Sequence, residues 1–501
     1  MSKSHIIQIN PNDNVVVCLD AIRQGETFTV GQKVVSALQD VPAGHKMLIN
    51  DCPAGTNIIK YGYPIGHVDE DMKAGQWINE HNLHTNLSGT LSYEYHPVQQ
   101  PAPATVEDFQ TPCFNGYQRA NGEVGVRNEI WIVPTVGCVN GIAQRLAELL
   151  AEETKLKGID GVHAWCHNYG CSQLGDDHEN TRKILRDICL HPNAGGVLVL
   201  SLGCENNQPD KFMETLGDYD HDRIKLLVTQ KVDGDEIEEG MRLLRQLYQT
   251  AITDRRQPVP INNLRIGLKC GGSDGFSGIT ANPLVGVLSD YIVAHGGSTV
   301  LTEVPEMFGA ETILMNRCKT PELFQKTVKM INDFKQYYLS HGEPVGENPS
   351  PGNKAGGIST LEDKALGCTQ KCGSALVSGV LEYGERISNN GLNLLSAPGN
   401  DLVASTALAA AGCQIVLFTT GRGTPFGTFV PTMKISTNDT LAQRKPNWID
   451  FNAGQLLDGM DMQQLMQELL NKLLLVANGQ QTQNEVNRYQ EIAIFKNGVT
   501  L

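Results

Sequence analysis

Four cysteines each stand at the carboxyl end of an expected strand and are followed by a turn. They are Cys138 in VGCVNG, Cys171 in YGCSQ, Cys204 in LGCENN and Cys270 in KCGGSDG. In open α/β sheets the ligand crevice lies outside these strand ends, so we expect the four thiols to converge there. Thiolates bind iron, zinc and iron–sulfur clusters, and Glu205 is a further candidate ligand. The alternative is that cysteine, a small and often buried residue, fills four tight junctions.

Three histidines are candidates for acid/base catalysis. His45 lies in GHK (44–46), His81 lies in NEHNLHTN (79–86), and His167 stands at the second of the strand-end turns. A histidine titrates near neutral pH and can also bind a metal, so His167 could equally join the thiols as a ligand. A structural role is the alternative for each of them.

Glycine-rich polar loops are candidates for substrate binding. CGGSDGFSGITANP (270–283) presents Ser273, Asp274 and backbone amides just before an expected helix, which suits carboxylate or hydroxyl oxygens. Further candidates are Lys354 in ENPSPGNKAGG, Arg422 in TTGRGTPFG, and the pair Arg127-Asn128 directly before EIWIVPTVGC. Each cation could hold a carboxylate, and arginine could do so with two hydrogen bonds. Singly each is a solvated loop charge, but together they predict a pocket for a polyol acid.

Composition narrows the range of partners. The 501 residues include 40 Lys and Arg against 55 Asp and Glu, a formal net charge of −15. This charge repels phosphate backbones and anionic lipid surfaces, so neither nucleic acid nor a membrane is an expected partner. No apolar run approaches the roughly 20 residues that span a bilayer, and no signal-peptide core follows the first residues. The 13 cysteines, an odd number, are typical of free thiols in a cytoplasmic protein, which is the expected location.

Several common enzyme motifs do not occur. GENPSPGNKAGG (346–357) lacks the spacing of a phosphate-binding loop, and no G-x-G-x-x-G follows an expected strand. Cys368-Thr-Gln-Lys-Cys372 has three residues between its cysteines and is not a redox C-x-x-C motif. These absences argue against P-loop enzymes and against a nicotinamide cofactor.

The distribution of apolar stretches, turn residues and prolines along the sequence predicts several domains. Residues 1–96 contain short apolar stretches between Gly/Pro turns, which predicts a small β domain. The proline-rich residues 97–112 predict a linker. From there on, apolar runs of strand length alternate with helix-length segments, as in parallel α/β proteins. A second change around TDRRQPVPINN (253–263) divides this part into regions 113–255 and 262–501.

Long motifs along nearly the whole chain resemble one family. They are GHK, KYGYPIG, AGQWINEHNLHTNL, NGEVGVRNEIWIVPTVGCVNGIA, NYGCSQLGDDH, SLGCENNQ, CGGSDGFSGITANP, TEVPEMFGAE, NPSPGNKAGG and TTGRGTPFG. Together they are similar to the altronate branch of the altronate/galactarate dehydratase family. The resemblance implies an N-terminal β-clip domain of the SAF type followed by α/β regions. It also implies dehydration of D-altronate to 2-dehydro-3-deoxy-D-gluconate, with a divalent metal, usually ferrous iron or manganese.

Dehydration of a sugar acid removes a weakly acidic C2 proton and expels the C3 hydroxyl. A metal on the carboxylate and a neighbouring hydroxyl would neutralise the developing charge, and arginine, lysine and backbone N–H groups would add to this. We expect the strand-end thiols with His167 or Glu205 to hold the metal, and His45 or His81 to move the proton. The small domain would then cover the α/β crevice. The sequence leaves open whether the chain forms a homo-oligomer.

Three alternatives to this function remain at the level of the sequence. The substrate could be galactarate or a sulfolactate-type acid. The enzyme could be an iron–sulfur hydro-lyase, in which a cluster iron carries the departing hydroxyl. The chain could also be a regulator that binds a sugar acid without catalysis, although its cysteine- and glycine-rich loops would then have no evident task.

Overall fold

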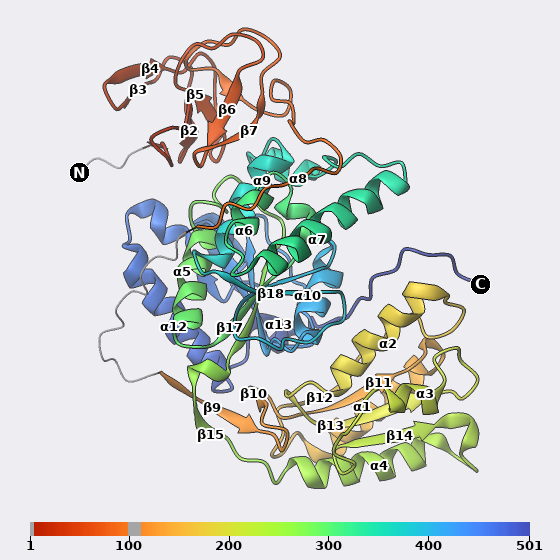
Figure 1. Ribbon diagram of the computed structural model, residues 1–501. Coiled ribbons are helices and arrows are strands. Elements are labelled where there is room, and N and C mark those ends of the chain that lie inside the picture. Colours follow the sequence, from red (N-terminus) through yellow and green to blue (C-terminus); the bar gives the residue numbers. More distant parts are fainter. Residues whose placement is uncertain (1–4, 99–111) are drawn as a thin grey trace.

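The computed structural model describes residues 5–98 and 112–501 (Figure 1). It contains a small β-rich N-terminal domain, a four-stranded parallel sheet and a seven-stranded parallel sheet. The expected fold class, a small β domain followed by two parallel α/β regions, is therefore confirmed. Most of the linker expected at 97–112 lies outside the described residues. Within the described residues, no helix combines the length and the apolar character that crossing a bilayer requires.

The N-terminal domain is built from short antiparallel strands. Its four-stranded sheet has the order β1-β2-β5-β8, and two hairpins, β3-β4 and β6-β7, extend from it. The strands are β1 (Ile6–Ile7), β2 (Val15–Cys18), β3 (Thr27–Val30), β4 (Lys33–Ser36), β5 (Lys46–Leu48), β6 (Asn57–Lys60), β7 (Tyr63–His67) and β8 (Trp77–Ile78). Part of the core of this domain is shared with helix α9 (Leu361–Cys368), which contributes Ala365 and Leu366. The domain is therefore docked on the C-terminal region and not tethered loosely.

The first α/β region holds a four-stranded parallel sheet with the order β12-β11-β13-β14. Its strands are β11 (Glu129–Pro134), β12 (Gly161–Ala164), β13 (Ala194–Ser201) and β14 (Ile224–Val228), and its helices are α1 (Asn140–Thr154), α2 (Gly175–Cys189), α3 (Pro209–Glu214) and α4 (Glu236–Ala251). β11 and β13 are buried along their whole length, which is expected of parallel strands covered on both faces.

The second α/β region holds a seven-stranded parallel sheet with the order β18-β19-β17-β16-β20-β21-β22. Its strands are β16 (Arg265–Cys270), β17 (Ser298–Leu301), β18 (Val377–Leu381), β19 (Gly391–Leu395), β20 (Ile415–Thr420), β21 (Thr432–Ser436) and β22 (Phe451–Asn452). With α9, its helices are α5 (Ala281–Ala294), α6 (Glu311–Met315), α7 (Pro321–Ser340), α8 (Pro351–Ala355), α10 (Asp401–Ala410), α11 (Asp439–Arg444), α12 (Met462–Ala477) and α13 (Gln483–Asn487). β16 lies at the centre of this sheet, so its carboxyl end is flanked by neighbouring strands on both sides.

Two contacts join the two α/β regions, which we expected to divide at residues 256–261. β15 (Gln257–Pro260) pairs antiparallel with β9 (Cys113–Gln118), which also pairs with β10 (Val124–Gly125) in a small sheet. The last residues of the chain return to the first α/β region, where the Leu501 amide donates to the Ser172 carbonyl at 2.9 Å. The two α/β regions are thus joined both near the start of the first region and at the last residue of the chain.

Glu129, the first residue of β11, is a buried carboxyl group whose titration should be visible in stability. Its Oε2 accepts a 2.7 Å hydrogen bond from Trp131 Nε1. Burial, together with the charge of Glu485, raises the pKa of Glu129 from 4.5 to about 8. Because the unfolded chain ionises first, Glu129 costs stability progressively as the pH rises from about 4.5 to about 8.

We therefore expect Glu129→Gln to raise the free energy of unfolding by about 1 to 3 kcal/mol at pH 8 and to change it little at pH 5. Glutamine keeps an acceptor for Trp131 but carries no charge. Thermal or denaturant unfolding of both proteins at the two pH values measures the difference. An equal effect at both pH values would contradict the assigned titration.

Candidate functional site

Two thiols and a carboxylate meet in the interior below the N-terminal domain. Cys270 ends the central strand β16, Glu306 lies in the short helix η4 (Val304–Met307) that follows β17, and Cys368 ends α9. Glu306 Oε2 lies 3.3 Å from the Cys270 sulfur and 3.2 Å from the Cys368 sulfur, and the two sulfurs are 3.3 Å apart. We call these three residues the thiol–carboxylate centre. Among the described residues they form the one group of three such ligand atoms lying within 4.8 Å of one another.

Ion pairs surround the thiol–carboxylate centre. They join Lys269 to Glu303 and to Asp401 (2.9 Å), Lys364 to Glu306 (2.7 Å) and Lys371 to Glu303 (3.2 Å). Burial opposes ionisation of Glu306, but the lysine charges outweigh it and lower the pKa of Glu306 to about 2. The hydrogen bond with Cys270 and burial raise the pKa of Cys368 well above its usual range. Without a cation, the centre therefore holds an ionised carboxylate and a protonated Cys368 thiol.

The charges of the centre suit a divalent cation. Counted at full ionisation, the three lysines and the three carboxylates cancel, so ionisation of both thiols would leave two uncompensated negative charges in a buried site. A divalent metal would neutralise them, with release of the thiol protons on binding. The donor set of two sulfurs and one carboxylate oxygen suits a first-row transition metal better than magnesium or calcium. The residues present thus fit a metal ion.

A cavity of about 550 Å³ lies between the N-terminal domain and the loops of the seven-stranded sheet. Its walls include Leu19–Ala21, Ala43, Asp274, Phe276, Ala355, Gly356, Gly421, Arg422, Asn438 and Arg444. We call it the interdomain cavity. The backbones approach closely beside it, because a Cβ on Gly275 would lie 1.9 Å from the carbonyl oxygen of Gly44. Arg422 and Arg444 are exposed there and could bind an anionic substrate.

Asp274 connects the interdomain cavity to the thiol–carboxylate centre. Its carboxylate accepts hydrogen bonds from Ser277 (3.1 Å), Thr437 (2.9 Å) and Asn438 (3.0 Å). Burial raises the pKa of Asp274 despite these donors. Asp274 also lines a second cavity of about 10 Å³, together with Lys364 and Cys368. A group bound near Asp274 would therefore lie between the cavity and the centre.

The three candidate histidines differ in their surroundings. His45 is buried beside the interdomain cavity, where its Nδ1 accepts from Trp77 Nε1 (3.1 Å) and its Nε2 lies 3.4 Å from the Ala355 carbonyl. Burial and the Lys46 charge lower its pKa, so His45 is neutral near pH 7. The His81 side chain is 85% exposed. His167 lies in the other α/β region.

His167 is fully engaged by the backbone. Its Nε2 lies 2.7 Å from the carbonyl oxygen of Pro134, and its Nδ1 accepts from the Tyr169 amide at 3.1 Å. Burial lowers its pKa to about 4. Both ring nitrogens are therefore occupied in positioning a loop, which leaves no free nitrogen for a metal or a substrate proton.

The four strand-end cysteines divide between the two parallel sheets. Cys138, Cys171 and Cys204 follow strands of the four-stranded sheet and are exposed, whereas Cys270 ends a strand of the seven-stranded sheet and is buried. Figure 1 shows the four-stranded sheet at the end of the molecule opposite the N-terminal domain, which lies close to α9. The expectation that all four thiols converge is therefore wrong: three of them lie at one sheet, and Cys270 lies at the other. The three exposed cysteines lie in a different part of the molecule from the interdomain cavity.

The candidate substrate-binding residues are also distributed. Ser273 is buried beside Asp274, and Lys354 is half-buried in α8, next to Ala355 of the cavity wall. Arg127 and Asn128 precede β11, so they lie at the amino edge of their sheet, opposite the strand ends where ligands bind. Arg127 forms a buried ion pair with Glu485 at 2.8 Å. We therefore do not include this pair in the proposed substrate site.

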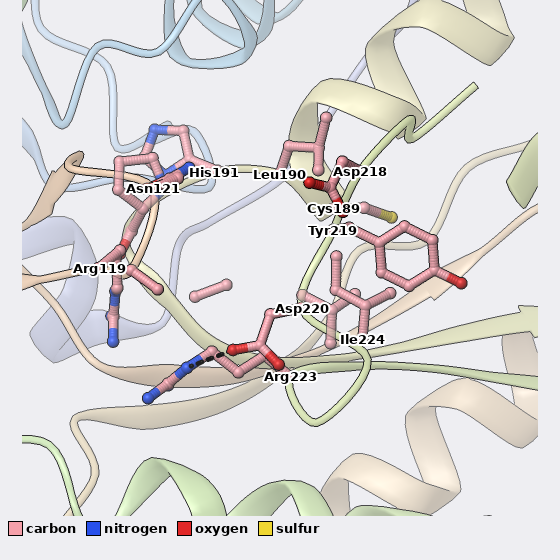
Figure 2. A pocket seen from close by; sticks show the side chains of 14 residues that line it. Arg119, Asn121, Cys189, Leu190, His191, Asp218, Tyr219, Asp220, Arg223 and Ile224 are labelled. Atoms are coloured by element: carbon pink, nitrogen blue, oxygen red, sulfur yellow. Dashed lines mark hydrogen bonds and ion pairs between the residues drawn. The ribbon is translucent and has the colours of Figure 1, made fainter. Parts of the chain in front are cut away.

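A cavity of about 370 Å³ at the other edge of the four-stranded sheet is shown in Figure 2. It is lined by the starts of β13 and β14 and by Arg119, His191, Asp220 and Arg223. Both arginines bind Asp254, at 2.8 and 2.7 Å, so their charges are already compensated. Its position at the amino ends of parallel strands also makes it the less suitable substrate site.

Glu306 and Cys368 were not among the residues expected from the sequence. Glu306 follows β17, the neighbour of β16, so the rule that ligands gather at strand ends could have identified it from TEVPEMFGAE. Cys368 ends a helix nearly 100 residues after Cys270, and no local pattern marks it. Only the folded chain brings these residues together.

Comparisons with known proteins cover nearly the whole chain. The models of three families match: "D-galactarate/Altronate dehydratase, C-terminal" over residues 261–500, "D-galactarate dehydratase/Altronate hydrolase, second domain" over 116–252, and "Altronate/galactarate dehydratase SAF domain" over 4–86. The chain is 56% identical over 496 residues to altronate dehydratase of Escherichia coli (strain K12) and 55% identical over 497 residues to that of Bacillus subtilis (strain 168), with 99% of each chain covered. It is 31% identical over 507 residues to galactarate dehydratase (L-threo-forming) of Escherichia coli (strain K12), which covers 98% of this chain and 96% of that one.

Proposed function

This chain belongs to the altronate/galactarate dehydratase family, and from that membership we propose that it is a hydro-lyase that converts D-altronate to 2-dehydro-3-deoxy-D-gluconate and water. The observation that carries this proposal is the identity of 55 to 56% to altronate dehydratases over 99% of the chain, against 31% to a galactarate dehydratase. We place the enzyme in the cytoplasm, because the relatives that it matches are bacterial metabolic enzymes.

We place the substrate in the interdomain cavity. Arg422 and Arg444 provide positive charge for the carboxylate. His45 is uncharged near pH 7, as a general base must be before it accepts a proton, and its Nε2 lies 3.4 Å from the carbonyl of Ala355 in the cavity wall. To take a substrate proton, His45 exchanges the Trp77 hydrogen bond at Nδ1 or this long contact at Nε2 for the substrate. The N-terminal domain forms one wall, so it excludes water from this face of the substrate.

We place the metal at the thiol–carboxylate centre, held by Cys270, Glu306 and Cys368. Thiolate ligands favour ferrous iron over manganese, which prefers oxygen ligands. When bound, the metal supplies Lewis-acid stabilisation of negative charge on the substrate. Lys364 keeps Glu306 ionised, and Asp274 lies between the centre and the open cavity because it lines both cavities.

The test is an assay for 2-keto acid formation from D-altronate by the whole enzyme, purified without oxygen. We expect turnover after reconstitution with Fe²⁺, weaker turnover with Mn²⁺ and little after chelation. Galactarate and sulfolactate are assayed in parallel. Faster turnover of either acid than of D-altronate would contradict the proposed substrate, and full activity after complete removal of metal would contradict the metal.

Arg422→Met is expected to raise KM for D-altronate about 10- to 100-fold, with a smaller change in kcat. Its guanidinium lies in the interdomain cavity, and one charged hydrogen-bond partner of a carboxylate contributes about 1.5 to 3 kcal/mol. Steady-state kinetics measure both constants. Arg145→Met is the control, because Arg145 is exposed and pairs with Glu148 on helix α1. An unchanged KM for the Arg422 variant would show that the carboxylate binds elsewhere.

A further inference from the structure

Three exposed thiols gather at the carboxyl edge of the four-stranded sheet, where the proposed function does not use them. Of the 13 cysteines, eight are buried and four are exposed, and three of these four are Cys138, Cys171 and Cys204. Cysteine is among the most frequently buried residue types, so three exposed thiols on one sheet edge are not explained by packing. We call this group the three-thiol edge.

Hydrogen bonds tie the three cysteine loops together. The Gly137 amide donates to the Tyr169 carbonyl at 2.9 Å, which joins the first loop to the second. The Asn207 amide donates to the Gly170 carbonyl at 3.0 Å and its side chain donates to the Thr135 carbonyl at 3.3 Å, which joins the third loop to both others. Each cysteine is within three residues of one of these bonds, so the three loops that carry the thiols pack against one another.

Glycines allow this close approach. Gly137 and Gly170 directly precede Cys138 and Cys171. A Cβ on Gly137 would lie 2.8 Å from the carbonyl oxygen of His167, and a Cβ on Gly170 would lie 2.0 Å from that of Thr135. Any side chain at these positions would push the loops apart and separate the thiols.

The polar groups around the three-thiol edge favour a sulfur-rich ligand. Glu205 lies below the edge, but its oxygens are taken by the Thr135 hydroxyl (2.7 Å) and by the amides of Leu202 and Gly203 (3.2 and 2.6 Å). It is therefore a structural residue and not a ligand. Gln173, which is 3% exposed, has a buried Nε2 with no partner in the described part of the chain. Gln173 Oε1 accepts from the Gly170 amide at 3.1 Å, so this side chain lies against the residue that precedes Cys171.

The spacing of the thiols excludes a single tetrahedral ion in the present arrangement. Bonds of 2.3 Å to a zinc ion require sulfurs about 3.8 Å apart. Within the described residues, no three ligand atoms at this edge lie within 4.8 Å of one another, whereas those of the thiol–carboxylate centre do. An iron–sulfur cluster presents its irons at separate corners, so it is held by thiolates that lie further apart.

We propose that Cys138, Cys171 and Cys204 bind an iron–sulfur cluster, in which one iron has no protein thiolate. The cluster assembles from ferrous and ferric iron and inorganic sulfide, with no change of oxidation state, as the three thiols lose their protons to solvent. Gln173 donates a hydrogen bond to a cluster sulfur, and Gln230, whose Nε2 already lies 3.4 Å from the Cys204 sulfur, does the same on the other side. This site does not depend on the proposed reaction, because it lies in a different α/β region from the interdomain cavity.

The test measures iron and acid-labile sulfide in the full-length protein purified without oxygen. We expect on the order of three to four iron atoms and a similar number of sulfides per chain, beyond any iron in the thiol–carboxylate centre. Cys138→Ser, Cys171→Ser and Cys204→Ser are each expected to lose most of the sulfide. Cys113→Ser, the control for an exposed cysteine elsewhere, and Cys368→Ser in the thiol–carboxylate centre are expected to keep it. Retention of all iron and sulfide in the triple variant, or one zinc per chain without sulfide, would overturn the proposal.

A second measurement needs no variant. Iodoacetamide is expected to modify Cys138, Cys171 and Cys204 slowly in the anaerobic protein and at least about tenfold faster after the cluster is removed by oxidation and chelation. Cys113, which is exposed, reports the intrinsic rate in both samples. Equal labelling of the three thiols before and after removal would overturn the proposal even where a serine variant does not fold. Loss of D-altronate turnover with an intact cluster would instead count against the proposed function alone.

Discussion

Cys368→Ser is expected to lower kcat/KM for D-altronate by about 100- to 1,000-fold, because a Lewis-acid metal contributes several kcal/mol to the transition state. The Cys368 sulfur lies 3.3 Å from that of Cys270 and 3.2 Å from Glu306 Oε2, so it completes the proposed set of ligands. A serine hydroxyl does not ionise near neutral pH and is a poor ligand for ferrous iron. We therefore expect the variant to lose bound iron together with activity.

Cys318→Ser is the matched control for this variant. Cys318 is also buried, and its sulfur contacts the Thr327 hydroxyl at 3.3 Å, in the core and outside the thiol–carboxylate centre. The control is expected to lose some stability and to keep its iron and its kcat/KM. Turnover is measured at saturating Fe²⁺ as well, because excess metal should restore part of the activity of Cys368→Ser if the defect is one of affinity. Full activity of Cys368→Ser without added iron would place the metal elsewhere.

The sequence was informative about candidate site residues where their role follows from their position at the end of a strand. The rule that ligands gather at the carboxyl ends of parallel strands led to Cys270, Asp274 and Arg422, and the structure places these three around the interdomain cavity and the thiol–carboxylate centre. The same rule applied to Arg127 and Asn128 would have assigned them to the opposite edge. Their prediction rests on a cation in a loop directly before a strand, and charge alone does not distinguish a ligand from an internal ion pair such as that of Arg127 with Glu485.

Sheet membership could not be predicted from the sequence. Cys138, Cys171, Cys204 and Cys270 have the same local context, a buried strand followed by a glycine-containing turn. Whether two strands share a sheet depends on long-range pairing, here of β16 with β17 and β20 and not with β13. For the same reason, Cys368 and Lys371 could not be assigned to a site near Cys270, because each lies about 100 residues away in the chain.

The contact between the N-terminal domain and α9 could not be predicted from the sequence either. GHK and KYGYPIG marked Lys46 and Lys60 as parts of motifs, but not as partners of one carboxylate. In the structure both lysines bind Asp363, at 2.8 and 2.9 Å, and the side chains of all three are almost completely buried. The motif that contains the candidate base His45 is thus held in place by an ion pair to the other domain.

Asp363→Asn is accordingly expected to destabilise the protein by about 3 to 5 kcal/mol, because it leaves two buried ammonium groups without their counter-charge. Burial opposes ionisation of Asp363, but Lys46 and Lys60 outweigh it and hold its pKa well below its usual range. This stabilisation is therefore present above the ordinary aspartate pKa of about 4 and is lost as the pH falls below it. Denaturant unfolding at pH 7 measures the difference, and limited proteolysis reports whether the N-terminal domain separates first.

Asp51→Asn provides the comparison that isolates burial. Asp51 and Lys73 form an ion pair of 2.9 Å within the N-terminal domain, the same length as the pair of Asp363 with Lys60. The side chains of Asp51 and Lys73, however, are both more than half exposed. A surface pair of this kind contributes at most about 1 kcal/mol, so its loss should change unfolding little. If the two variants lose similar amounts of stability, burial of Asp363 does not determine its contribution. A much lower denaturant midpoint for Asp363→Asn, together with early cleavage of its N-terminal domain, would show that the ion pair keeps this domain over the interdomain cavity. The variant should then lose D-altronate turnover in proportion to the fraction of molecules whose N-terminal domain has separated.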